Sequence, residues 1–351
     1  MKTLSYGDKM MPDKNRKLTI YDISEKSGVS IATVSRVLNG ATNVKRETKA
    51  AVESVMREMG YTPNAFARGL GLDTMKTIGI LCADSSDTYL AKAVYYIEEQ
   101  LRENNYDSLL CCTGYEAAGK RNALDLLLSK KVDAAILVGS TFLEASERGN
   151  KYINCAAAQI PVMMLNASMD YPNVYCVFCD DYAATKQATE RLIDRGCKKI
   201  LYLSNSKTYS AKKKRAGFIA ALEERRRPVS EAYIRYCETG REDITGAIEY
   251  LDKLWTDGIT FDAIVTAEDI LAVAAVKFAA KKGLSIPKDL KVIGYNNSLL
   301  ATVTSPEITS VDNRLKPMCD QLVETLLNVL SGREMPKKCE FSGELVIRGS
   351  I

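Results

Sequence analysis

Residues 30–40, SIATVSRVLNG, place hydroxyl and guanidinium side chains on a short helical pattern. Ser30 is a good N-cap for this helix, and an Asn-Gly pair ends it after little more than two turns. Thr33 and Ser35 can donate hydrogen bonds to phosphates, and Arg36 can donate two to the O6 and N7 of one guanine. These are the side chains that a slim helix lying in the DNA major groove requires.

Two further helices would have to position this one. Residues 20–28 predict a first helix that ends at a glycine, and residues 45–60 predict a third that also ends at a glycine. A helix, a tight turn and a short second helix form a helix-turn-helix arrangement, in which Val34 and Val37 face the interior. The alternative is a three-helix unit that caps a larger α-helical domain.

The composition narrows the possible functions. The chain has 351 residues, enough for two or three domains, and its net charge of +4 is too small to indicate nucleic acid by itself. It contains no histidine, which excludes histidine-based catalysis and zinc sites with histidine ligands. Its ten cysteines lack paired metal-ligand spacing, so we expect no metal, no cofactor and reduced thiols. The polar N-terminus has no signal-peptide pattern, and no apolar run approaches about 18 residues, so a cytoplasmic protein without a membrane partner is expected.

From Lys76 onward, short apolar runs alternate with longer amphipathic patterns. Helices are expected at residues 89–104, 181–196 and 268–283. The expected strands cover residues 77–82, 134–139, 161–166, 174–178, 199–204, 263–267 and 291–296. Such alternation predicts parallel sheets with helices on both faces, and its length predicts two similar lobes. A ligand would bind in the cleft, at the carboxyl ends of the strands.

The longer motifs resemble one known family. TIYDISEKSGVSIATVSRVLNG and GYTPNAFARGL are similar to the N-terminus of lac-repressor-family (LacI/GalR) regulators. The resemblance continues through GFIAAL, FDAIVTAED, GLSIPKDLKVIGYNN and PEITSVD, and it covers Leu18 to Arg348. ATVSRVLNG together with ARGL is similar to the catabolite control branch of that family.

The resemblance implies an architecture. An N-terminal all-α helix-turn-helix head with a hinge helix is followed by an α/β core, like that of periplasmic binding proteins, with two doubly wound parallel-sheet lobes. The expected parts are a disordered basic tail (1–17), the head (18–62), the hinge helix and linker (63–75) and the core (76–351). The two lobes are expected at 76–178 plus 310–335, and at 179–307 plus 338–348.

The resemblance also implies DNA-contacting roles. The bases would be read by Ile31, Ala32 and Arg36, with apolar contacts from the first two and hydrogen bonds from Arg36. Contacts to the DNA backbone are expected from Tyr21, Ser30, Thr33, Ser35, Asn39 and Thr48. Contacts in the minor groove are expected from Asn64, Ala67 and Leu70, with the leucine wedged between bases so that the duplex bends. The alternatives are that Tyr21 and Thr48 are surface or packing residues and that the hinge packs on the core.

The expected effector cleft departs from the family pattern. The family holds a sugar with an arginine and an aspartate, and the matching positions here are Lys214 and Asn296. Cys179, Arg241 and Glu268 complete the expected cleft. A lysine is a point charge and suits a phosphate or carboxylate better than a pair of hydroxyls. We therefore expect an anionic small molecule, or a partner protein, rather than a neutral hexose. The alternative is that Lys214 faces solvent and a sugar still binds.

The resulting prediction is a sequence-specific transcriptional regulator, acting as a repressor, whose operator affinity is controlled allosterically by a small-molecule effector. It would bind a pseudo-palindromic double-stranded operator as a homodimer. Two other classes of function are kept as alternatives. A pure sugar-binding module would need no DNA-binding head, and an enzyme would use the carboxylates of Glu268 and Asp269, although Asp269 is better placed to begin the next helix.

Overall fold

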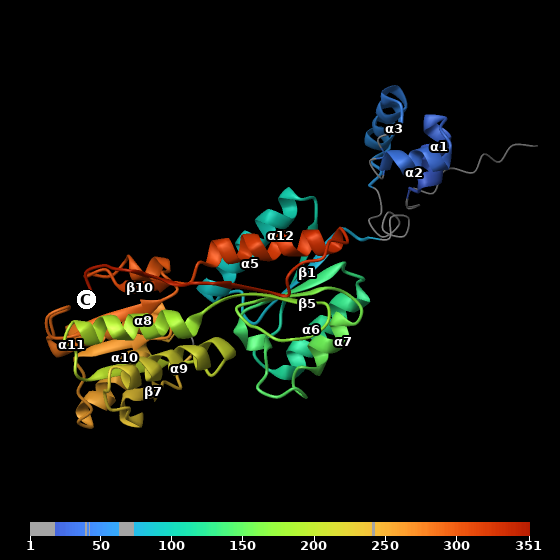
Figure 1. Cartoon of the computed structure of the whole chain (residues 1–351). Coiled ribbons are helices and arrows are strands. Elements are labelled where there is room, and N and C mark those ends of the chain that lie inside the picture. The colour runs from blue at the N-terminus through green and yellow to red at the C-terminus, as the bar shows by residue number, and fades with distance from the viewer. Residues whose placement is uncertain (1–17, 39–40, 42, 63–73, 241–242) are drawn as a thin grey trace, which may run out of the picture. The chain divides into compact units, whose positions relative to one another are not determined.

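The computed structural model describes residues 18–38, 41, 43–62, 74–240 and 243–351. The chain separates into two compact units, residues 1–75 and 76–351 (Figure 1).

The described residues of the first unit form a bundle of three helices, α1 (Ile20–Ser27), α2 (Ile31–Leu38) and α3 (Arg46–Met59). The carboxylate of Asp22 accepts from both the backbone N–H and the hydroxyl of Thr19 at 2.7 Å, which stabilises the start of α1. Gly28 then ends this helix in the left-handed conformation, at φ 66°, which glycine adopts without strain. The small core of the bundle is formed by Ile23, Val34, Val37 and Val52.

The second unit contains two six-stranded sheets. The order in the first sheet is β11 (Lys338–Phe341), β5 (Val174–Cys179), β4 (Val162–Leu165), β3 (Ala134–Val138), β1 (Thr77–Cys82) and β2 (Asp107–Cys112), all parallel. One face is covered by α5 (Thr88–Glu103) and α12 (Leu315–Leu330), and the other by α6 (Ala117–Ser129) and α7 (Lys151–Ala157) (Figure 1).

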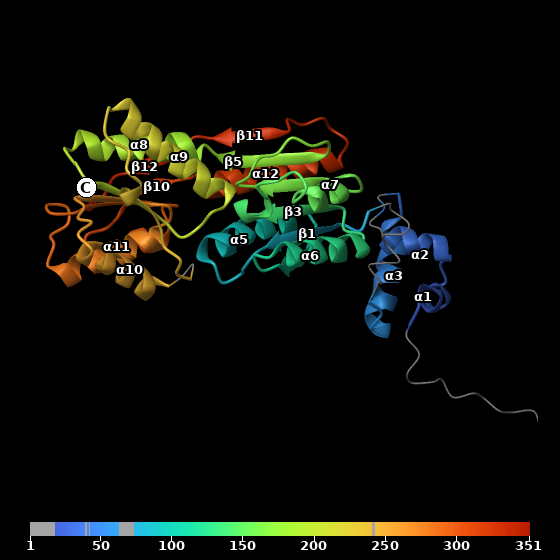
Figure 2. The same ribbon diagram turned by 90° about the horizontal axis from the view of Figure 1, so that it is seen from below.

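The second sheet repeats this arrangement. Its order is β12 (Glu344–Val346), β10 (Thr309–Asp312), β9 (Lys291–Tyr295), β8 (Ala263–Thr266), β6 (Ile200–Ser204) and β7 (Ile234–Tyr236), with β12 antiparallel to β10. Figure 2 shows α8 (Asp181–Asp194) and α9 (Tyr209–Glu224) on one side of it, and α10 (Ile244–Thr256) and α11 (Asp269–Lys282) on the other. Short 3₁₀ turns occur at η1 (Ser140–Phe142), η2 (Glu231–Tyr233) and η3 (Leu299–Ala301).

The seven expected strands are all confirmed, because each is an apolar run buried on both faces of its sheet. In β3, for example, all five residues AAILV are buried. The strands that the sequence did not indicate are short or lie at edges. β2, DSLLCC, is an edge strand with partly exposed side chains, and β12 has only three residues. Such strands lack the continuous apolar run on which the prediction depends.

The expected division of the C-terminal residues between the lobes is wrong in two places. Residues 310–312 were expected in the first lobe, yet β10 belongs to the second sheet. Residues 338–341 were expected in the second lobe, yet β11 belongs to the first sheet, beside β5. The strands TSVD, between β9 and β12, and KCEF, at the edge beside β5, have only four residues each, and their sequences do not specify which sheet they join.

Among the residues that the structure describes, no helix is both long enough and apolar enough to cross a membrane.

Candidate nucleic-acid interface and ligand cavity

The second helix of the bundle has one buried face and one exposed face. Val34 and Val37 are buried against α1 and α3, as the sequence predicted. Ile31, Ala32 and Arg36 are all exposed. Because residues 32 and 36 are four apart on a helix, they lie on the same side, with Ile31 next to them. The three candidates for reading bases therefore form one accessible surface, which we call the α2 surface.

Hydroxyl groups gather at the start of the same helix. The hydroxyl groups of Ser30 and Thr33 are 2.9 Å apart, and the backbone N–H of Thr33 donates to the Ser30 hydroxyl. Tyr21 is 65% exposed on α1, while Ser35 on α2 and Thr48 on α3 are partly buried. These side chains can donate to phosphate oxygens beside the α2 surface.

Five of the expected site residues lie outside the described residues: Asn39, Asn64, Ala67, Leu70 and Arg241.

A cavity lies between the two sheets of the second unit, at the carboxyl ends of their strands. Ser140 follows β3 and Asn166 follows β4 in the first sheet, while Ser206 follows β6 and Glu268 follows β8 in the second. Asn296 follows β9. The empty space is about 570 Å³, part of it open to solvent. In both sheets the strand order reverses beside this point, where open α/β sheets bind ligands.

Tyr89 is the centre of a hydrogen-bonded cluster on one wall. Its hydroxyl accepts from the side-chain amides of Asn166, at 2.8 Å, and Asn313, at 3.0 Å. Burial raises the pKa of Tyr89 well above its ordinary value, so the hydroxyl keeps a proton to donate. The Oδ1 atoms of Asn166 and Asn313 are buried and have no hydrogen-bond partner among the described residues. Asn166 lines the cavity, whereas Asn313 is not among its lining residues, so the acceptor that this wall offers to a ligand with hydrogen-bond donors is the Oδ1 of Asn166.

The opposite wall carries the cation that the sequence singled out. Lys214, on α9, is 6% exposed, and its Nζ donates to the carbonyl of Ala267 at 2.8 Å. The same Nζ lies 3.6 Å from the centre of the Tyr295 ring. Lys214 thus lines the cavity, as expected, but its charge already has protein partners.

Beneath Lys214 lies a buried carboxylate. Asp181 is 3% exposed and accepts from the hydroxyls of Ser210 and Tyr295, both at 2.5 Å. Burial raises the pKa of Asp181, while the charge of Lys214 and the two hydroxyl donors act in the opposite direction. Burial therefore outweighs the nearby cation and the two donors, and the pKa of Asp181 lies above its ordinary value.

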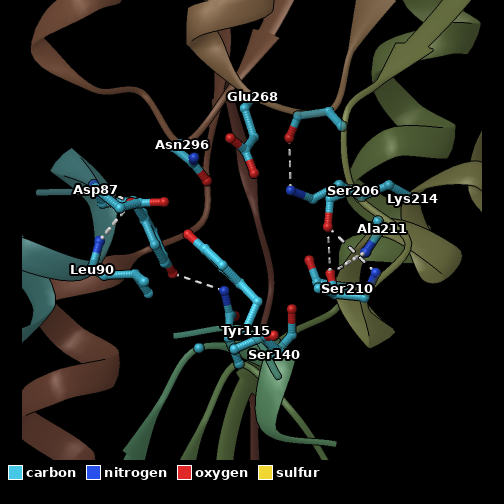
Figure 3. A pocket seen from close by; sticks show the side chains of 16 residues that line it. Asp87, Leu90, Tyr115, Ser140, Ser206, Ser210, Ala211, Lys214, Glu268 and Asn296 are labelled. Carbon is cyan, nitrogen blue, oxygen red and sulfur yellow. Dashed lines mark hydrogen bonds between the residues drawn. The ribbon is translucent and has the colours of Figure 1, made fainter. Parts of the chain in front are cut away.

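Carboxylates and helix N-termini complete the lining. Figure 3 shows Glu268 and Asn296, from the second lobe, opposite Tyr115 and Ser140, from the first. The carboxylate of Asp87 accepts from the first backbone N–H groups of α5, at 3.0 Å, and so caps that helix. The α9 and α11 helices also begin at this cavity, so three helix N-termini open onto it.

One expected cleft residue, Cys179, is not among the residues that line the cavity, and neither is Asp269, the second carboxylate of the enzyme alternative. Cys179 does not line the cavity: it is 3% exposed, and its thiol is hydrogen-bonded to the Tyr295 hydroxyl below it. Asp269 begins α11, as expected, and its carboxylate accepts from Ser298 and Ser310. These hydrogen bonds join α11 to other segments of the second lobe, so the carboxylate of Asp269 is not arranged as an acid or base beside Glu268.

Most of the first-lobe wall, including Tyr89 and Asn166, was not predicted from the sequence, and neither was Asn313, which donates to Tyr89. One signal was available for Asn166, because it directly follows an apolar strand, at the position where parallel sheets bind ligands. No comparable signal existed for Asn313, which is 224 residues from Tyr89 in the chain.

A helix-turn-helix bundle followed by two α/β lobes around a cavity defines a ligand-controlled DNA-binding protein. The sequence model of "Bacterial regulatory proteins, lacI family" matches residues 19–64. The model of "Periplasmic binding proteins and sugar binding domain of LacI family" matches residues 75–346. The chain belongs to the LacI family and is a DNA-binding transcriptional regulator of that family.

Individual relatives agree with this assignment. An HTH-type transcriptional regulator of Lachnoclostridium phytofermentans is 51% identical over 94% of this chain and 98% of the relative. The catabolite control protein A of Priestia megaterium is 32% identical over 86% of this chain and 89% of the relative. A crystal structure of the lac repressor dimer bound to operator and the anti-inducer ONPF has the same fold, with a TM-score of 0.84 at 22% identity, over 95% of this chain and 99% of that chain. The named relatives are regulators and repressors, not enzymes.

Proposed function

We propose that this protein is a repressor that binds a pseudo-palindromic operator as a homodimer. Its affinity for the operator would fall or rise when an effector occupies the cavity. The DNA-binding part of this proposal rests on the α2 surface, where Ile31, Ala32 and Arg36 are exposed on a helix whose opposite face is buried. A dimer with two-fold symmetry presents this surface twice, so its operator should contain two inverted half-sites.

We assign Arg36 the hydrogen-bonded reading of a guanine, and Ile31 and Ala32 apolar contacts with thymine methyl groups. Tyr21, Ser30, Thr33, Ser35, Asn39 and Thr48 would hold the DNA backbone. Residues 63–75 would form the hinge, with Asn64, Ala67 and Leu70 in the minor groove and the leucine bending the duplex. Residues 1–17 would be a basic tail. The end-to-end distance of a labelled operator should be shorter in complex with the wild-type protein than with Leu70→Ala. Equal distances would contradict the role of Leu70 in bending the duplex.

For the effector, the cavity favours a small polar molecule rich in hydrogen-bond donors. The free acceptor in the lining is the Oδ1 atom of Asn166, while Lys214 already donates to Ala267. The carboxylates of Asp87 and Glu268 add negative charge to the lining. A hydroxyl-bearing molecule of the sugar class therefore fits better than the anion that the sequence suggested. The solved relatives include a regulator named CelR in complex with cellobiose.

A second candidate is sensing of a partner protein. It is favoured by the 32% identity to a catabolite control protein A, but no feature of the described residues requires such a partner. In either case we propose a cytoplasmic protein, since all ten cysteines are free thiols.

The experiment that tests the proposal uses the full chain and the DNA upstream of its own gene. DNase footprinting should reveal one protected inverted repeat, and mutation of either half-site should abolish the protection. A panel of sugars, added to the same footprint, should contain one that changes the protection. Binding of equal strength to any DNA fragment would contradict the proposal.

A further inference from the structure

Two thiols from neighbouring strands lie in contact at the rim of the first sheet. Cys82 is the last residue of β1 and Cys112 is the last residue of β2, and the two are paired in register. Their Sγ atoms are 3.9 Å apart. Adjacent strands lie about 4.8 Å apart, which is within the Cα separation of about 4.4–6.8 Å that a disulfide needs. The backbone thus already has the spacing for a bond between these sulfurs.

Cys111, the third cysteine of this region, is excluded as a disulfide partner because its side chain points to the other face of the sheet. Cys111 packs in the apolar cluster beneath α6 and α7, whereas Cys82 packs in the cluster beneath α5 and α12. Successive residues of a strand point to opposite faces, so Cys112 shares a face with Cys82 and Cys111 does not.

We propose that Cys82 and Cys112 form a peroxide-sensitive thiol pair, whose intrachain disulfide restrains two loops that line the cavity. Cys112 is exposed and Cys82 is buried, so an oxidant from solvent reaches Cys112 first. The pair combines an accessible thiol with a second one in contact, which is the arrangement that converts an oxidised cysteine into a disulfide.

The chemistry requires a peroxide as the oxidant. The thiolate of Cys112 attacks one peroxide oxygen, the O–O bond breaks, and Cys112 becomes a sulfenic acid as hydroxide leaves and takes up the proton that the thiol lost. The proton of the Cys82 thiol then passes to the sulfenic oxygen of Cys112 as the Cys82 sulfur attacks the Cys112 sulfur. The S–O bond breaks, the S–S bond forms and the oxygen leaves as water. Two thiols lose two electrons in all, and hydrogen peroxide is reduced to two waters.

The electrostatics support this order of events. Burial, together with the contact with Cys112 and the nearby carboxylates of Asp84 and Asp87, raises the pKa of Cys82 to about 12. Cys82 therefore remains a thiol at neutral pH and is a poor first target for an oxidant.

The loops that follow the two cysteines connect them to the cavity. The backbone N–H of Thr113 donates to the carbonyl of Cys82 at 2.9 Å, and that of Gly114 donates to the carbonyl of Ala83 at 2.9 Å. The first loop ends at Asp87, which caps α5, and the second continues to Tyr115; both side chains line the cavity. A covalent bond at the base of these loops reduces their freedom and couples the oxidation state to ligand binding.

Intact mass spectrometry and peptide mapping of the full chain test the bond itself. Hydrogen peroxide should lower the mass by about 2 Da, reversibly with dithiothreitol, and the mapped cross-link should join Cys82 to Cys112. Cys112→Ser should abolish the loss of mass, while Cys155→Ser, which removes an exposed thiol on α7, should leave it intact. A Cys111–Cys112 bond, a bond between two chains, or over-oxidation of Cys112 without a cross-link would each overturn the proposal.

Hydrogen exchange tests the link to the cavity without any ligand. In the oxidised protein, amides of residues 83–87 and 113–115 should exchange more slowly than in the reduced protein. The difference should vanish in Cys112→Ser and persist in Cys155→Ser. Unchanged exchange in a protein that carries the mapped cross-link would show that the bond forms without affecting the cavity.

Discussion

The Nζ of Lys214 lies 3.6 Å from the centre of the Tyr295 ring, at the base of the cavity. The hydroxyl of the same tyrosine donates to Asp181 at 2.5 Å, so one side chain contacts both a buried cation and a buried carboxyl group. Lys214 also donates to the carbonyl of Ala267. The cation that the sequence presented as an anion receptor therefore already has protein partners, and this changes the chemistry expected of the effector.

The first prediction concerns Arg36. Replacing Arg36 with alanine should weaken binding to the operator by about 1–3 kcal/mol, because a bidentate contact with guanine is lost. Binding to unrelated DNA should change much less, since that depends on phosphate contacts. Titrations by fluorescence anisotropy with operator and scrambled duplexes measure both. Arg57→Ala, on α3, is the control for loss of a positive charge. An equal loss on both duplexes would make Arg36 a phosphate contact.

A second prediction concerns the independence of the head. Ile23 is fully buried in a core with few other members, and Ile23→Ala should cost about 2–5 kcal/mol, enough to unfold a domain of this size. Operator binding should disappear with part of the helical circular dichroism signal. The core should be unaffected, as reported by fluorescence of Trp255, the single tryptophan, which packs against Phe261 and Phe278.

The matched control for this change is Ile31→Ala. Ile31 is 41% exposed on the α2 surface, so its replacement should leave the helical signal intact while it alters DNA recognition. If Ile23→Ala also shifted the melting of the Trp255 region, the two units would not fold independently.

The parts predicted well from sequence are those in which one local pattern suffices. Val34 and Val37 were correctly placed in the core of the head because helical spacing determines which face is buried. The cavity walls were predicted unevenly, because Lys214 and Glu268 lie in recognisable motifs but the Tyr89–Asn313 contact joins distant segments. The assignment of β10 and β11 to the wrong lobes has the same origin. The chain crosses between lobes around residues 312–315 and 341–344, and the local sequence pattern does not indicate where a crossing occurs.

A third prediction follows from the buried carboxylate. Burial raises the pKa of Asp181 above its ordinary 3.8, so the folded protein binds this proton more tightly than the unfolded chain does. Its contribution to stability is fully present below 3.8 and is lost as the pH rises through the raised pKa. The free energy of unfolding of the wild type, minus that of Asp181→Asn, should therefore fall as the pH rises from about 4 to 7.

Urea denaturation at several pH values, followed by Trp255 fluorescence, measures this difference. The exposed residue Asp257 provides the control, because Asp257→Asn removes a carboxylate that is not buried. A difference for Asp181→Asn that grows with pH would mean that pairing with Lys214 outweighs burial.

The last prediction separates the two classes of effector. Because a bound ligand raises the melting temperature, a thermal-shift panel of neutral sugars, sugar phosphates, sugar acids and nucleosides reports which class binds. We expect the largest shift from a neutral, hydroxyl-rich molecule, since Asn166 offers a free acceptor in the cavity while Lys214 already has partners. That shift should shrink in Asn166→Ala, by about 1–3 kcal/mol of binding free energy for one lost hydrogen bond in a buried site. Lys214→Ala should retain part of it, and Lys212→Ala, which replaces an exposed lysine on the same helix, should retain all of it.

The contrary outcome is strong stabilisation by an anion, lost in Lys214→Ala but not in Lys212→Ala. Lys214 would then leave the carbonyl of Ala267 to bind the ligand, and the anionic effector expected from the sequence would be correct.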